Sequence, residues 1–258
     1  GTIESYGKLD LNYPKKNYYW EIGINYISKE IPDGYSREDV GIFSLLGKKE
    51  DVTILKMAVK DLEFVSEMFQ RVIGQKIPID RMYIIIDDLS GRGSLYQNAG
   101  GYLREPNIIM LDRGILENPY IPSLQKTIIH EMAHAVTLPL IFSWEQKFTA
   151  WLDEGIAVFF ENYAANKYLG GTDYFIEKDN EGNLLFRQDL DKQFTPSTLR
   201  TQYEKKFMFD VPGNQDEIEM FYTHAGLVFY SFYKKVGDEG MQKFFKEIGP
   251  LHSSGVCP

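Results

Sequence analysis

Residues 128–136, which read IIHEMAHAV, restrict the fold more than any other stretch of this chain. Their apolar residues predict a largely buried helix, and His130 and His134 lie on one face of it, about 40° apart. Two imidazoles and the carboxylate of Glu131 would be costly to bury without a partner. Unless the pattern arises by chance, the fold must supply that partner, and the spacing favours a zinc ion.

A third zinc ligand is expected from residues 150–161, which read AWLDEGIAVFFE. Zinc in hydrolases takes three protein ligands and leaves one position for water, and Glu154 comes twenty residues after His134 on the next predicted helix. Glu161 follows about 20° off the same helix face. Glu161 either accepts a hydrogen bond from a ligand histidine or is a solvated charge. Two histidines and one glutamate favour zinc, with manganese or cobalt as the alternatives.

The pair HEMAH and WLDEGIAVFFE resembles the gluzincin metallopeptidases. Within them it resembles the aminopeptidase-like group, whose second motif reads W-L-x-E-G-x-A. The resemblance implies a thermolysin-like α+β catalytic domain that binds one Zn²⁺ ion and hydrolyses a peptide or protein substrate. It makes His130, His134 and Glu154 the metal ligands and Glu131 the general base. Thermolysin has an Asp four residues after the third ligand, where this chain has Val158.

Stabilisation of the oxyanion needs a second electrophile besides the metal. Gluzincins take it from a later helix, and residues 219–232 offer both Tyr222 and His224. Tyr222 resembles the tyrosine of the aminopeptidase-like group, and His224 is the rival. The alternative is that this aromatic stretch is simply core.

Substrate binding is expected along residues 100–107, which read GGYLREPN. A peptide could add there as a further strand, and the glycines allow close backbone approach, although a glycine bulge is an equal alternative. The G-x-M-E-N signature with which aminopeptidases grip a free amine is absent, so the choice between exopeptidase and endopeptidase stays open. The candidate substrate-binding residues are Gly100, Gly101, Tyr102 and Glu105.

Strand patterns come early in the chain and helical patterns late, which predicts an α+β fold in one domain, 1–258. We expect a lobe with a mixed sheet and the active-site helix over about 1–140, a helical lobe over about 141–258, and the active-site cleft between them. The expected elements are strands at 18–27, 81–87 and 100–111 with Pro106 at an edge or bulge, a hairpin at 174–186, and helices at 50–73, 122–137 ended by Pro139, 146–168, 217–236 and 238–248 split at Gly237.

The composition limits the kinds of partner that the protein is expected to bind. The net charge is −9 and no long basic run occurs, so nucleic acid is not expected as a partner. No apolar run reaches the roughly 18–20 residues of a membrane span. The single cysteine, Cys257, allows neither a disulfide framework nor a cysteine-based zinc site. If a signal or anchor once preceded Gly1, a secreted or cell-envelope location is favoured.

A second function class is a peptide-binding or sensor module that keeps the gluzincin fold and the metal but cleaves nothing. The presence of Glu131 speaks against it, because a purely structural metal site needs no general base.

Overall fold

The computed structural model of the chain describes residues 31, 33–77, 79–87, 101–105, 107–116, 120–141, 150–170, 176–178, 184–186 and 215–253. The strand expected at 18–27 and Cys257 lie outside these residues. Among the helices so described, none combines the length and the apolar character needed to cross a membrane.

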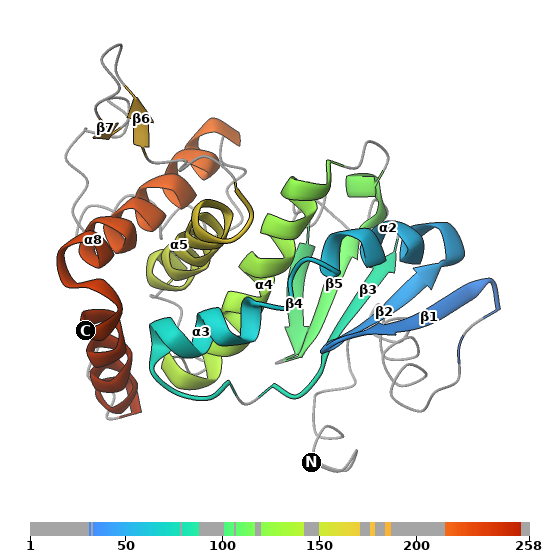
Figure 1. The fold of residues 1–258 in the computed structure, drawn as a ribbon, viewed down its shortest axis with the longest axis horizontal. Helices are drawn as coiled ribbons and strands as arrows, with labels where there is room; N and C mark the ends of the chain where they lie inside the picture. The colour runs from blue at the N-terminus through green and yellow to red at the C-terminus, as the bar shows by residue number, and fades with distance from the viewer. Residues whose placement is uncertain are drawn as a thin grey trace, which may run out of the picture.

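A five-stranded mixed sheet forms one side of the molecule (Figure 1). Its order is β1-β2-β3-β5-β4; β2, β3 and β5 run parallel, and the edge strands β1 and β4 are antiparallel to their neighbours. A mixed sheet packed with helices confirms the α+β prediction at this level. The strands are β1 (Tyr35–Val40), β2 (Phe43–Lys48), β3 (Met82–Asp87), β4 (Gly101–Glu105) and β5 (Ile108–Asp112).

The central strand β3 has the sequence expected of a strand that is buried on both faces. Its side chains alternate between two apolar clusters: Ile84 and Ile86 join the large core under the helices, whereas Ile85 joins a small cluster on the opposite face. The prediction of a buried strand at 81–87 is therefore confirmed, one residue shorter at its start.

The single strand expected at 100–111 is wrong, because this stretch forms two strands. β4 and β5 pair with each other in antiparallel fashion, so the chain reverses between Glu105 and Ile108. Proline lacks the N–H that a continuous strand would need, which explains a reversal at this point of the sequence. β4 is the last strand of the described sheet, so the predicted edge position is present, and the register shifts between Leu103 and Glu105.

The single helix expected at 50–73 is also wrong. The chain forms α2 (Lys49–Val59) and α3 (Val65–Ile73), joined by a tight turn in which the Leu62 N–H donates to the Val59 carbonyl at 3.0 Å. α2 packs on β1 and β2, whereas α3 packs on the distant helix α8 (Gln215–Ser253). Both helices bury apolar residues in the same core, so the helical spacing of apolar residues continues through the turn. Periodicity alone therefore does not show where the first helix ends and the second begins.

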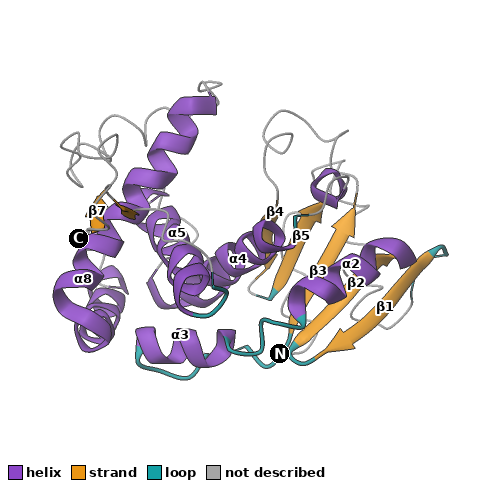
Figure 2. Ribbon diagram, turned by 45° about the horizontal axis from the view of Figure 1, so that its top comes forward, coloured by secondary structure: helices purple, strands orange, loops and turns teal. Residues whose placement is uncertain are grey.

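Three further helices carry the candidate site (Figure 2). α4 (Ile121–Ile141) packs against α5 (Ala150–Lys167), and α5 packs against α8. Pro139 does not end α4, which continues for two more residues. A proline close to a helix C-terminus removes only one late hydrogen bond, so a full stop is not required.

The remaining predictions concern the C-terminal half. α8 is interrupted at Gly237, where φ is 63° and ψ is −167°, so the predicted split at this glycine is confirmed. The predicted hairpin is present as β6 (Ile176–Lys178) and β7 (Leu184–Phe186), which pair in antiparallel fashion. A short 3-10 helix, η2 (Arg113–Leu116), follows β5. The division into lobes near residue 140 stays a prediction.

Candidate metal centre

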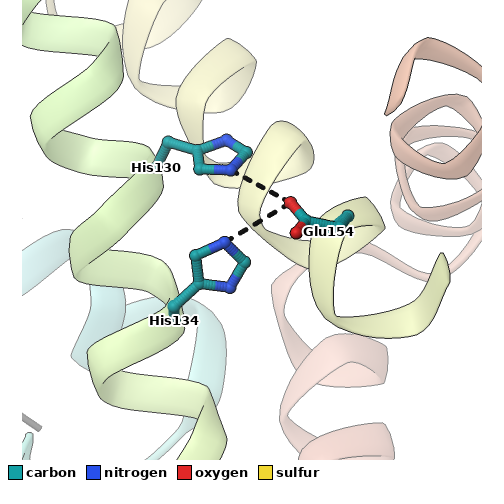
Figure 3. Close-up of side chains that lie close together, drawn as sticks. All are labelled: His130, His134 and Glu154. Carbon is teal, nitrogen blue, oxygen red and sulfur yellow. Dashed lines mark hydrogen bonds and ion pairs between the residues drawn. The ribbon is translucent and has the colours of Figure 1, made fainter. Parts of the chain in front are cut away.

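Two imidazoles on α4 and one carboxylate on α5 point at the same place (Figure 3). His130 Nε2 lies 3.2 Å from Glu154 Oε2, and His134 Nε2 lies 3.4 Å from the same oxygen. One ligand atom from each of the three residues lies within 4.8 Å of the other two. The four-residue spacing on α4 and the packing of α5 beside it are what bring the three groups together.

This donor set fits a zinc ion. Ligand atoms about 2.0–2.1 Å from a tetrahedral zinc ion are separated from each other by about 3.4 Å. The two separations between imidazole nitrogen and carboxylate oxygen already have this length. Two imidazoles and one carboxylate are also the protein ligands of many hydrolytic zinc sites.

A further carboxylate contacts each histidine at Nδ1, the ring nitrogen that does not face Glu154. His130 Nδ1 lies 3.3 Å from Glu161 Oε2, the contact expected of Glu161 if it orients a ligand histidine. His134 Nδ1 lies 2.8 Å from Asp153 Oδ1. Hydrogen bonds of this kind leave Nε2 of each ring as the nitrogen available to a metal. The role of Glu161 toward a metal stays a prediction.

Sequence reasoning missed Asp153. It occupies the variable position of the W-L-x-E-G-x-A pattern, immediately before Glu154. A carboxylate next to a candidate ligand, in the first turn of α5, was the available signal. It could not be interpreted without knowing which group of α4 faces that turn.

The carboxylates dominate the electrostatics of the site. Burial disfavours the charged imidazole of His130, but hydrogen bonds with Glu154 and Glu161 outweigh burial and raise its pKa to about 10. Burial likewise opposes a charge on His134, but the charges of Asp153 and Glu154 raise its pKa well above the usual value. Burial would raise the pKa of Glu154, and the two imidazoles lower it instead. The surroundings therefore stabilise positive charge at this point, which a divalent cation would supply.

Glu131 follows His130 on α4 and is buried, with 7% of its surface exposed. It is not among the three groups that converge as candidate ligands. Its charge reaches the phenol of Tyr222 on α8: burial first, and then the charges of Glu154 and Glu131, raise the pKa of Tyr222 well above its usual value. The carboxylates of Glu131 and Glu154 therefore both lie close enough to Tyr222 to act on its phenol.

The structure separates the two candidates for the oxyanion role. The Tyr222 ring lies 6.0 Å from the His130 ring, measured between centroids. Two positions along a helix turn a side chain by about 200°, so His224 leaves α8 in nearly the opposite direction. His224 is buried, with 2% of its surface exposed. The geometry therefore favours Tyr222 as the residue that faces the candidate metal centre.

The predicted substrate strand is the edge strand β4. Gly101, Tyr102 and Glu105 lie on it, Gly100 lies outside the described residues, and nothing is described of the side chains along β4. β4 packs against α4, the helix that carries both histidines. In the described part of the sheet, β4 pairs only with β5, so its other edge faces away from the sheet.

Comparison with known proteins supports the fold. No protein-family model matches the chain, and no curated protein matches it. Solved structures do: the native leukotriene A4 hydrolase of Saccharomyces cerevisiae matches with a TM-score of 0.52 and 16% identity, over 83% of this chain and 33% of that one. The yeast enzyme in complex with bestatin matches with a TM-score of 0.51 and 15% identity, over the same shares. The chain thus spans about a third of these hydrolases and shares their fold over that part.

Proposed function

We propose that this protein is a zinc-dependent peptidase whose metal is held by His130, His134 and Glu154. The observation that carries the proposal is the convergence of both Nε2 atoms on one carboxylate, at 3.2 and 3.4 Å. The resemblance of HEMAH and WLDEGIA to the gluzincins supports it from the sequence. The fold shared with leukotriene A4 hydrolase supports it from the structure.

Peptide hydrolysis at this site would need a metal ion, a general base and a hydrogen-bond donor to the oxyanion. A zinc ion, when bound, supplies the Lewis acidity that polarises a scissile carbonyl and makes water more acidic. Glu131 accepts the proton of the attacking water and returns it to the leaving amine. Tyr222 donates a hydrogen bond to the oxygen on which negative charge develops. A tyrosine phenol is already protonated at neutral pH, and the raised pKa of Tyr222 keeps it a donor at still higher pH.

The substrate is proposed to be a peptide that lies along β4. An extended peptide can add to a sheet edge through backbone hydrogen bonds, and β4 is the last strand of the described sheet and packs beside α4.

The test is metal analysis together with cleavage of a quenched peptide library, in wild type and in Glu131→Gln. We expect one zinc ion per chain in both proteins. We expect cleavage by wild type and a loss of about 10²–10⁴-fold in kcat in the variant, the usual contribution of a general base. Glu247→Gln, an exposed glutamate at the far end of α8, is the matched control and should cleave like wild type.

The alternative function, a metal-holding peptide sensor without activity, predicts a different result. Wild type and Glu131→Gln would then bind zinc and peptides equally well and leave broad peptide pools intact. That outcome would refute the peptidase proposal and leave the metal site standing.

A further inference from the structure

We propose that Gly155 of α5 is a positioning residue: its contact with the backbone of α8 sets the separation between the ligand Glu154 and the phenol of Tyr222. The inference rests on the proposed function, since it assumes that Tyr222 donates to the oxyanion. It concerns the distance between the metal centre and that donor, which neither the motif nor the ligand geometry specifies.

α5 and α8 approach each other closely at Gly155. A Cβ atom built on Gly155 would lie 2.7 Å from the Ala225 carbonyl oxygen and 2.9 Å from the Ala225 carbonyl carbon. Both are backbone atoms, so no side-chain rotation can relieve the overlap. Ordinary van der Waals contact starts at 3.4 Å, so alanine at this position would force the helices apart by about 0.7 Å.

The contact lies between two residues of the site. Gly155 directly follows Glu154 on α5, and Ala225 comes three positions after Tyr222 on α8. Residues three apart share a helix face, so Tyr222 and Ala225 look toward α5 together. A displacement at the contact is therefore passed on to the position of the Tyr222 phenol relative to Glu154.

The geometry also indicates which helix would move. α5 is tied to α4 by polar contacts of His130 and His134 with three carboxylates, which a bound metal would reinforce. α5 and α8 are held mainly by ring contacts, such as Trp151 with Phe229 at 6.1 Å between centroids. Among the described residues their polar contacts are fewer: the Tyr163 hydroxyl donates to Asp238 Oδ1 over a long 3.5 Å, and Tyr222 forms a hydrogen bond with Glu154. We therefore expect Gly155→Ala to shift α8 and to leave the ligands together.

The test is a double-mutant cycle between Gly155→Ala and Tyr222→Phe, measured with zinc-loaded protein. We expect Gly155→Ala to lower kcat by about 10–100-fold, as a misplacement of up to about 1 Å does, with KM and zinc affinity within about threefold of wild type. Tyr222→Phe should lower kcat by about 10²–10³-fold. The double variant should match Tyr222→Phe alone, because the phenol that Gly155 positions is already gone.

A second readout does not depend on turnover. The cobalt(II) form of Gly155→Ala should keep the wild-type visible spectrum, while a phosphinic dipeptide that mimics the tetrahedral state should bind about 10-fold more weakly. The matched control is Gly114→Ala, because its added Cβ would meet nothing closer than 3.5 Å. It should match wild type in every measurement.

Three results would overturn the inference: wild-type kcat and phosphinic affinity in Gly155→Ala, loss of metal in that variant, or additive losses in the double variant. If Gly155→Ala does not fold, Gly155→Ala with Phe229→Leu removes the side-chain part of the overlap, now 2.9 Å to Phe229 Cδ2, and serves for the same cycle. If wild type and Glu131→Gln are equally inert, the proposed function fails, and the phosphinic and cobalt measurements still judge Gly155.

Discussion

Replacing Asp153 should weaken zinc binding more than replacing Glu161, although both carboxylates stand behind a candidate ligand histidine. Asp153 Oδ1 lies 2.8 Å from His134 Nδ1, whereas Glu161 Oε2 lies 3.3 Å from His130 Nδ1. Glu161 is also shared with Lys126, whose Nζ lies 3.9 Å from its other oxygen. Asp153 makes the shorter contact, and among the described residues it pairs with no lysine or arginine, so it is the stronger partner of the two.

The size of the effect follows from what each variant removes. Loss of the groups that orient metal ligands costs about 10–100-fold in affinity, equal to about 1.4–2.7 kcal/mol. Asp153→Asn keeps an oxygen that accepts a hydrogen bond and loses the charge, so we expect about 10-fold. Asp153→Ala loses both and should approach 100-fold. Glu161→Gln should stay within about threefold.

Competition with a chromophoric chelator, at fixed pH and ionic strength, measures these affinities directly. Circular dichroism of the metal-free proteins must first show that each variant is folded. The reasoning is refuted if Asp153→Ala binds zinc as tightly as wild type, or if Glu161→Gln loses more affinity than Asp153→Asn.

Two further predictions concern stability. Removing the metal with a chelator should lower the free energy of unfolding by about 2.7 kcal/mol, relative to protein with free zinc at 100 times its Kd. Added zinc should restore the melting temperature. A melting temperature that does not change would contradict a metal site in the folded state. Asp238→Asn should cost about 0.5–1 kcal/mol at pH 7, because Asp238 pairs with Arg71 at 2.7 Å. Burial raises the pKa of Asp238, but hydrogen bonds from Arg71 and Tyr233 and the charges of Lys167 and Arg71 together lower it below the usual value. The stabilisation is therefore present above about pH 4 and is lost as the pH falls further. Urea unfolding at pH 7 and pH 3 should show the difference between variant and wild type narrowing, and a constant difference would argue against the pair.

The core of the candidate site could be predicted because it depends on local rules. His130 and His134 share a helix face whatever the tertiary fold, and Glu154 lies on the next helix after a short connection. Packing of α4 against α5 then brings the three side chains together. The α+β class was equally accessible, because the order of strand and helix patterns along the chain carries it.

Errors in the elements came from long-range packing. α2 and α3 bury apolar residues in one core although they pack on different partners, so their spacing continues through the turn at Leu62. The sequences on both sides of Pro106 are each compatible with a strand, and only the pairing of β4 with β5 shows that the chain reverses. In both cases the spacing of apolar residues indicates which residues are buried, but it does not indicate which element they pack against.

The same limit explains why Asp153 was missed while the choice between Tyr222 and His224 was left open. Helix geometry states that Tyr222 and His224 point nearly opposite ways, but only the packing of α8 on α5 decides which of them faces the histidines. Likewise, Asp153 and Glu154 diverge by about 100°, and only the placement of α4 decides that His134 receives both. The assignment of Tyr222 depends on the packing of α8 on α5, which includes the close approach of Gly155 to the Ala225 carbonyl. A glycine at that position is therefore required by the backbone of α8, while its effect on the chemistry is expected to act through Tyr222.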